Sequence, residues 1–141
     1  MEMEEIQMQK KEIDWANLGF GYIVTDQRFV ANYKDGAWDE GHLTADPNVT
    51  MNECAGVLQY AQTVFEGMKA YTTVNGQIVT FRPDLNAKRM VDSAKRLEMP
   101  AFPEERFLEA VTETVRANAA YVPPYGSGAS LYIRPYMFGI N

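Results

Sequence analysis

The residues with the clearest capacity for chemistry lie near the C-terminus, where an arginine is embedded among aromatic and aliphatic side chains. Arg134 stands within the sequence LYIRPYMF at positions 131–138. In an extended strand, side-chain alternation places Tyr132 and Arg134 on the same face. A guanidinium among aromatic rings requires an anionic partner or water, and arginine binds carboxylates and phosphates through paired hydrogen bonds. The segment therefore indicates an anion-binding site, a structural ion pair or a solvated edge strand, and the residue types leave all three open.

Other polar and aromatic residues point to ordinary structural roles when each is considered alone. Arg89 falls toward the charged side of a predicted helix, which favours a solvated arginine. Tyr60 and Phe65 are expected to be core aromatics. Cys54, the single cysteine, is expected to be a buried, unreactive thiol. His42 is the single histidine, so no multi-histidine metal site is expected.

Composition and motifs disfavour several classes of protein. The 141 residues carry a net charge of -6, whereas a protein that binds nucleic-acid phosphates needs a basic face. Neither GxGxxG nor GxxxxGK[ST] occurs, so nucleotide-binding loops are unsupported. No secretory signal or membrane span is expected, because no sufficiently long apolar run occurs. A single cysteine permits no internal disulfide, which fits the cytoplasmic location that we expect.

The elements that must position these residues follow from periodicity and turn signals. Residues 1–14 are predicted to form a disordered N-terminal extension, and residues 15–141 a single domain. Asn75-Gly76 is a hairpin signal, because both residues tolerate positive φ. Strands are predicted where β-branched and aromatic residues gather, over 21–25, 28–33, 68–73, 77–81 and 130–138.

Three helices complete the predicted architecture, within 57–65, over 84–97, and from Pro103 toward residue 122. The apolar face of the second helix consists of Ala87, Met90, Ala94 and Leu97. This order of elements predicts an α+β fold, in which a two-layer sandwich is made of a mainly antiparallel sheet with helices packed on it.

Three blocks of sequence add a resemblance to a known family. They are YAQTVFEGMKAY at 60–71, FRPDLNAKRM at 81–90 and LYIRP at 131–135. In this order, and with Phe20-Gly21 before them, they resemble the N-terminal small domain of branched-chain amino acid aminotransferases. These are fold-type IV enzymes that use pyridoxal 5'-phosphate. Gln59 is a departure, because many relatives have histidine at that position.

The resemblance implies roles for six residues. Arg89 would contact the phosphate of the cofactor, in place of the solvated role that periodicity favours. Phe20, Phe65 and Tyr132 would line an apolar pocket for the branched side chain of the substrate. Tyr60 would reach across a dimer interface toward the partner's site. Arg134, with Tyr132, would order the carboxylate of the substrate.

The resemblance also implies that the catalytic lysine lies beyond Asn141. Lys69 is not that lysine, because it matches a structural lysine in the EGxKA pattern of the first block. No catalytic residue is therefore expected in this chain, and the isolated 141 residues are predicted to be inactive.

The implied reaction moves the amino group of leucine, isoleucine or valine to 2-oxoglutarate. It would take place in a full-length, cytoplasmic homodimer that serves branched-chain amino acid biosynthesis. Two alternatives stay open. One is another fold-type IV enzyme, such as a D-amino acid aminotransferase or an aminodeoxychorismate lyase. The other is a non-catalytic binding module.

Overall fold

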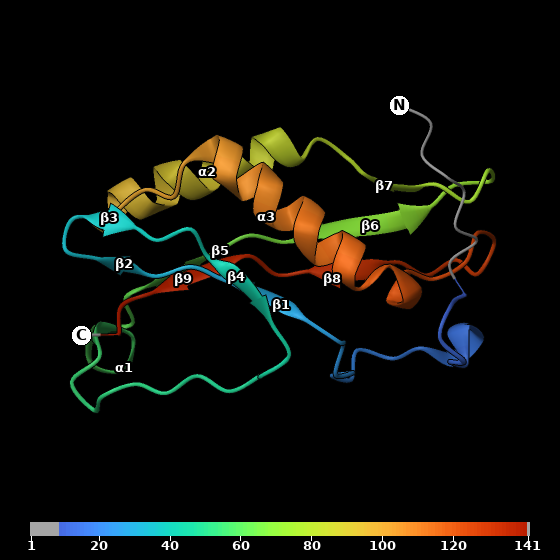
Figure 1. The fold of residues 1–141 in the computed structure, drawn as a ribbon, viewed down its shortest axis with the longest axis horizontal. Coiled ribbons are helices and arrows are strands. Elements are labelled where there is room, and N and C mark those ends of the chain that lie inside the picture. Colours follow the sequence, from blue (N-terminus) through green and yellow to red (C-terminus); the bar gives the residue numbers. More distant parts are fainter. Residues whose placement is uncertain (1–8, 141) are drawn as a thin grey trace.

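The structure is a computed structural model that describes residues 9–140, and it has two layers (Figure 1). Helices α2 (Pro83–Arg96) and α3 (Glu104–Ala117) pack together over one face of the strand layer. The strands of that layer are β5 (Thr63–Phe65), β6 (Met68–Thr72), β7 (Ile78–Thr80), β8 (Leu131–Ile133) and β9 (Tyr136–Phe138). All of their pairings are antiparallel, and the predicted α+β class is confirmed.

The central strands form one long ladder with a single register. β6 lies between β7 and β8, and β5 pairs with β9. Phe65 lies opposite Tyr136 in the second pair, and Met68 lies opposite Ile133 in the first. The two pairs are therefore consecutive parts of the same antiparallel ribbon. The turn predicted at Asn75-Gly76 joins β6 to β7, and the Thr73 N–H donates to the Gln77 carbonyl at 2.7 Å.

A break separates the two parts of this ribbon at Pro135. The Glu66 N–H donates to the Pro135 carbonyl at 2.8 Å, but proline has no N–H with which to return the bond. The prediction of one strand over 130–138 is therefore wrong, because the segment forms β8 and β9 with Arg134 and Pro135 between them.

The core lies between the ribbon and the two helices. The predicted apolar face of α2 is confirmed for Ala87, Met90 and Ala94, which are buried, but not for Leu97, which caps the helix and is exposed. The other buried apolar side chains that form this cluster are Val64, Met68, Ala70, Met99, Phe107, Val111, Val115, Val122, Ile133 and Met137.

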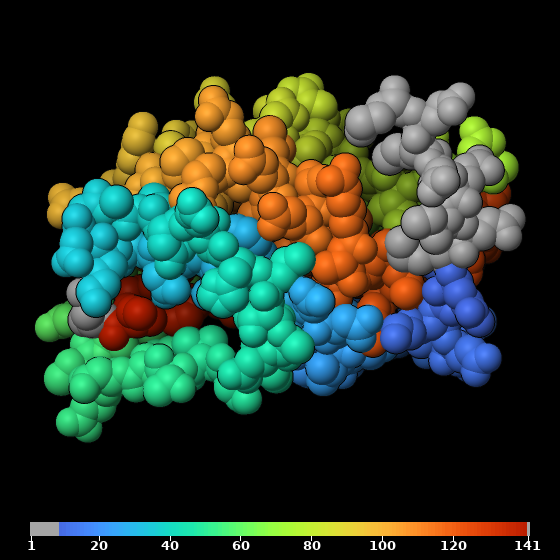
Figure 2. All heavy atoms as spheres, viewed as in Figure 1, coloured from blue at the N-terminus to red at the C-terminus, as the bar shows by residue number. Residues whose placement is uncertain are grey.

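The remaining elements are short. They are η1 (Trp15–Asn17), β1 (Arg28–Val30), β2 (Tyr33–Lys34), β3 (Ala37–Trp38), β4 (His42–Thr44), α1 (Gly56–Tyr60) and η2 (Ala119–Tyr121), where η marks a 3-10 turn. β1 pairs with β4, and β2 with β3. In Figure 2 the cyan β2–β3 hairpin lies against the orange helical layer, where the Trp38 indole donates to the Ala101 carbonyl at 2.9 Å.

Two predicted strands in this region differ from the structure. Residues 21–25 form no strand, and Tyr22, Ile23 and Val24 are exposed. Strand propensity describes how well a side chain suits a half-buried pleated surface, and this segment has no partner strand to supply one. The strand predicted over 28–33 is shorter and divides into β1 and the start of β2.

Side chains at the end of α3 hold the N-terminal segment. The buried Asn118 accepts a hydrogen bond from the Gln27 N–H at 2.9 Å and donates to the Gln27 carbonyl at 2.7 Å. Part of the extension predicted over 1–14 lies outside the described residues. Within its described part, the Lys11 N–H donates to the Ala120 carbonyl and Lys10 Nζ donates to the Ala119 carbonyl.

Candidate active site

One face of the strand layer carries an exposed group of aromatic and apolar side chains. Alternation along the strands buries Val64 and Met68 against the helices and turns Phe65 and Tyr71 the other way. We call this group the outer face, and it consists of Phe65, Tyr71, Val79, Phe81, Tyr132 and Tyr136. Contiguous exposed apolar surface of this kind commonly marks a ligand-binding site or a protein interface.

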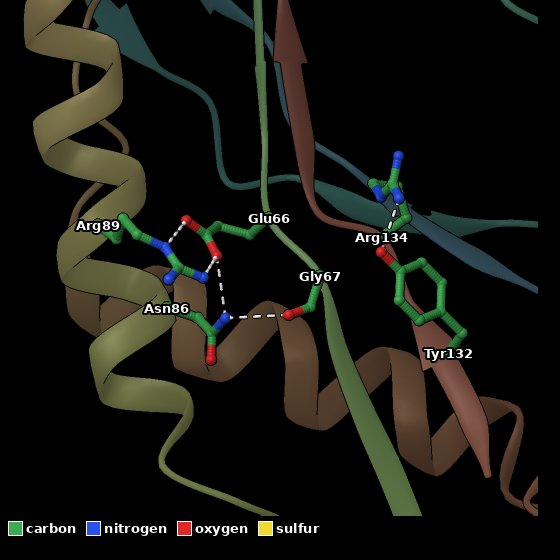
Figure 3. Close-up of polar contacts among 6 residues, drawn as sticks. All are labelled: Glu66, Gly67, Asn86, Arg89, Tyr132 and Arg134. Carbon is green, nitrogen blue, oxygen red and sulfur yellow. Dashed lines mark hydrogen bonds and ion pairs between the residues drawn. The ribbon is translucent and has the colours of Figure 1, made fainter.

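Arg134 lies within the outer face, as its sequence context predicts. Its Nη2 donates to the Tyr132 hydroxyl at 2.6 Å (Figure 3), which confirms that the two side chains share a face. The centre of the guanidinium lies 4.4 Å from the centroid of the Phe65 ring and 5.1 Å from that of Tyr132, a range typical of cation–π contacts. Among residues 9–140 no carboxylate pairs with Arg134. The described part of the chain thus supplies no ion pair for Arg134, whose side chain is exposed.

The absence of a side chain at Gly67 makes room for the Tyr132 phenol. A Cβ atom added at Gly67 would lie closer to the Tyr132 hydroxyl oxygen than any real contact of this kind. Only a residue without a side chain lets the phenol cross the strand at this point and reach Arg134.

A second group of polar residues lies on the other side of the same strand segment. Glu66 points toward the helices and is only 3% exposed. Arg89 on α2 donates to it twice, from Nε to Oε1 at 2.6 Å and from Nη2 to Oε2 at 2.5 Å. Asn86 Nδ2 donates to the same Oε2 at 2.9 Å and to the Gly67 carbonyl at 3.2 Å (Figure 3).

The electrostatics of this group keep both partners charged. Burial alone would raise the pKa of Glu66, but the hydrogen bonds from Arg89 and Asn86 outweigh it and hold the pKa below its usual value. The same contacts from Glu66 raise the pKa of Arg89. The Arg89 side chain is 67% exposed, so the guanidinium N–H groups that do not bond Glu66 can meet a ligand.

Glu66 and Asn86 are not among the site residues predicted from the sequence. One signal could have found Glu66, because it occupies a position between Val64 and Met68 that alternation assigns to the core. A carboxylate predicted to be buried requires a cation and hydrogen-bond donors nearby. Asn86 has no comparable signal, since a polar residue in a helix is usually solvated.

A hollow of about 260 Å³ has Gly67, Asn86 and Tyr132 in its lining, whereas neither Arg89 nor Arg134 lines it. Lys69 also lines it and lies opposite Tyr132 in the β6–β8 ladder, with its side chain exposed. Gly67 and Asn86 connect the hollow to the hydrogen bonds around Glu66, and Tyr132 connects it to Arg134. An exposed lysine beside aromatic side chains suits a ligand that has an anionic group and an apolar part.

Two predicted site residues lie apart from this group. Phe20 is fully exposed, and Tyr60 is 84% exposed at the end of α1, where it lines a separate hollow of about 400 Å³. Within the described residues, no hydrogen bond or ring contact joins either side chain to Arg134 or Arg89. Neither Tyr60 nor Phe65 is a core aromatic. Cys54 is exposed, so the prediction of a buried thiol is wrong.

Metal-binding clusters and long apolar helices are both missing from the described part of the chain. No group of three or more side chains in residues 9–140 is placed to hold a metal ion. No helix in that range is both long and apolar enough to cross a membrane.

Comparison with known proteins identifies the relatives of this chain. A branched-chain-amino-acid aminotransferase of Haemophilus influenzae is 52% identical over 93% of the chain, and one of Helicobacter pylori is 48% identical over the same share. Over nearly its whole length the chain is thus similar to branched-chain-amino-acid aminotransferases. It spans 38% of the length of each of these two relatives and matches their N-terminal part. No family model matches it.

A solved branched-chain aminotransferase structure supports the same relationship. The T.th. enzyme, complexed with N-(5'-phosphopyridoxyl)-L-glutamate, is 30% identical and superposes with a TM-score of 0.61. The superposition covers 83% of this chain and 34% of that one. The fold described above is thus found in an experimentally determined branched-chain aminotransferase.

Proposed function

We propose that this chain forms the substrate-side part of the active site of a branched-chain amino acid transaminase. The enzyme would move the amino group of leucine, isoleucine or valine to 2-oxoglutarate with pyridoxal 5'-phosphate as cofactor. The observation that carries the proposal is the position of Arg134 among Phe65 and Tyr132 on an exposed face. The names of the relatives and the phosphopyridoxyl-glutamate complex of the T.th. enzyme support it.

The outer face has the two properties that such a substrate demands. Transfer of a branched aliphatic side chain from water to an aromatic wall lowers the free energy, and we assign this wall to Phe65 and Tyr132. Phe20, which lies apart from them and is fully exposed here, would line the same pocket in the longer protein. The α-carboxylate needs oriented donors, and we assign these to Arg134 and the Tyr132 hydroxyl. Tyr60 would face the site of a second subunit in a homodimer.

The residues around Arg89 suit a phosphate group. Two of its N–H groups bond Glu66, and the guanidinium has five in all. The others remain for phosphate oxygens, and the side chain is exposed enough to reach them. When bound, pyridoxal phosphate supplies the electron sink that makes the α-proton of an amino acid labile.

The residue that moves this proton is expected outside residues 1–141. Lys69 is exposed beside Tyr132, but we assign it a structural role. The longer protein would work in the cytoplasm as a homodimer and serve branched-chain amino acid biosynthesis.

The proposal is tested by amino transfer from L-leucine to 2-oxoglutarate with added pyridoxal phosphate. The protein from the complete reading frame that contains this chain is compared with the 141 residues alone. Activity in the first and none in the second is expected. A visible cofactor absorbance band in the isolated chain would contradict the assignment of the lysine.

A panel of amino donors separates the proposal from its alternatives. Transfer from D-alanine but not from L-leucine would indicate a D-amino acid aminotransferase. A folded full-frame protein that accepts no donor would indicate a binding module.

A further inference from the structure

Glu66 is an unusual residue for its position. It lies on the core-facing side of the ribbon, in line with Val64 and Met68, and is 3% exposed. An apolar residue would suit this position better, because a buried carboxylate loses its hydration and destabilises the fold unless partners replace the water. Packing alone therefore does not account for a carboxylate here.

The partners of Glu66 are arranged to fix one guanidinium. Both carboxylate oxygens accept from Arg89, at 2.6 and 2.5 Å, in a two-point contact that sets both the position and the plane of the guanidinium. Asn86 in turn bonds the carboxylate and the Gly67 carbonyl, which ties the carboxylate to the backbone of the ribbon. This two-point contact, which we call the fork, therefore starts from a carboxylate held in the core (Figure 3). The Arg89 side chain as a whole is nevertheless mostly exposed.

We propose that Glu66, held by Asn86, is a positioning residue that orients Arg89 toward the phosphate of the cofactor. The identity of that anion rests on the function proposed above, whereas the orientation of Arg89 rests on the contacts alone. A free arginine side chain would lose rotamer freedom on binding a phosphate. Glu66 imposes that loss during folding, so the remaining N–H groups of Arg89 are already aligned when the phosphate arrives.

The charge of Glu66 and its orienting role have opposite effects on phosphate binding. The negative charge of Glu66 repels a phosphate and offsets part of the charge of Arg89. If charge alone mattered, replacing Glu66 with neutral glutamine would strengthen phosphate binding. If orientation dominates, as we propose, the same substitution weakens it.

The test uses the protein from the complete reading frame and two ligands, pyridoxal phosphate and pyridoxal, which lacks the phosphate. Their dissociation constants are measured by fluorescence titration. For Glu66→Gln the constant for pyridoxal phosphate is expected to rise roughly tenfold, the effect of losing one hydrogen bond to a charged group. The constant for pyridoxal should not change. An unchanged or tighter constant for pyridoxal phosphate would overturn the positioning role.

The double variant Glu66→Gln/Arg89→Ala shows whether Glu66 acts through Arg89. It should bind pyridoxal phosphate no more weakly than Arg89→Ala alone, because the fork has no function once the guanidinium is gone. Additive losses would mean that Glu66 acts independently of Arg89, against the proposal.

Matched variants cover misfolding and general charge effects. If Glu66→Gln does not fold, Arg89→Lys keeps the charge but cannot form the fork, and wild-type affinity in that variant would overturn the proposal. Asp84→Asn removes the carboxylate from a similar but exposed fork with Arg82, and it should change neither constant.

Binding by the wild-type protein separates failure of the cofactor assignment from failure of the positioning role. A wild type without preference for the phosphorylated ligand would overturn the cofactor assignment and the positioning role together. A wild type that has the preference, and keeps it in Glu66→Gln, would overturn the positioning role alone.

Discussion

At the residue scale, Gly67 is the tightest constraint in the candidate site. It is linked to both arginine groups, because its carbonyl accepts from Asn86 and a Cβ added to it would collide with the Tyr132 hydroxyl. Its φ is not in the left-handed region, so alanine is compatible with the backbone. What excludes alanine is the space that the phenol occupies.

Gly67→Ala should therefore displace the Tyr132 ring and break its 2.6 Å bond with Arg134 while the fold persists. We expect the KM for L-leucine of the full-frame enzyme to rise roughly tenfold, since a hydrogen bond with a charged donor contributes about 1.5–3 kcal/mol. Steady-state kinetics check this, and an unchanged KM would contradict it. Gly21→Ala is the control, because a Cβ added there has nothing within 4 Å. Its melting temperature should equal that of the unmodified protein.

Glu66 should make the stability of the fold depend on pH. Its pKa is lower in the folded chain than in the unfolded one, where a glutamate titrates at about pH 4.3. Its stabilising contribution is therefore fully present above that pH and is lost as the pH falls through the folded-state pKa. Thermal unfolding followed from about pH 6 downward should show a steeper acid loss in wild type than in Glu66→Gln. Parallel profiles would be evidence against the buried ion pair.

Single-residue patterns predicted only part of the site. Alternation identified the shared face of Tyr132 and Arg134, because that relation depends only on strand geometry. The role expected of Arg89 came from the resemblance, since its place on the helix favours solvent. Its contact with Glu66 joins residues that are distant in sequence, and no local pattern encodes which helix residue meets which strand residue.

At the element scale, local signals sufficed where an element forms by itself. Helix α2, helix α3 and the β6–β7 hairpin follow from apolar periodicity, prolines and Asn75-Gly76. Residues 21–25 and 130–138 were mispredicted for two different reasons. The first has strand-forming residues but no partner. The second contains Pro135, whose missing N–H is visible in the sequence and should have divided the strand.

Asn118 joins the end of α3 to the N-terminal segment through its hydrogen bonds with Gln27. Its replacement should lower the free energy of unfolding. Asn118→Ala leaves the half-buried Gln27 N–H and carbonyl without their partners, at a total cost of about 1–3 kcal/mol. Urea denaturation should show the loss in the free energy of unfolding. Asn17→Ala, which removes only a local exposed bond to Asp14, should have little effect, and equal losses would argue against the joint.

At the scale of the whole molecule, the outer face leaves six large side chains in water on one side of a thin fold. Exposed aromatic surface of this extent promotes association. We expect the isolated 141 residues to self-associate at high concentration, and Phe81→Ser, which removes a ring that is 83% exposed, to reduce this. Size-exclusion chromatography with light scattering checks both, and a sharp monomer peak from the unmodified chain would refute the expectation.

The order of the strands along the chain delays completion of the ribbon during synthesis. β5 and β6 leave the ribosome early, yet their partners β9 and β8 are made only after both helices. Until then the nascent chain can form α2, α3 and the β6–β7 hairpin, but it cannot close the ribbon or surround Glu66. Non-local pairing of this kind slows folding and leaves strand edges unprotected meanwhile. Ribosome-bound chains that end before residue 131 should therefore depend on chaperones to remain soluble, even though most of their helical residues are already in place.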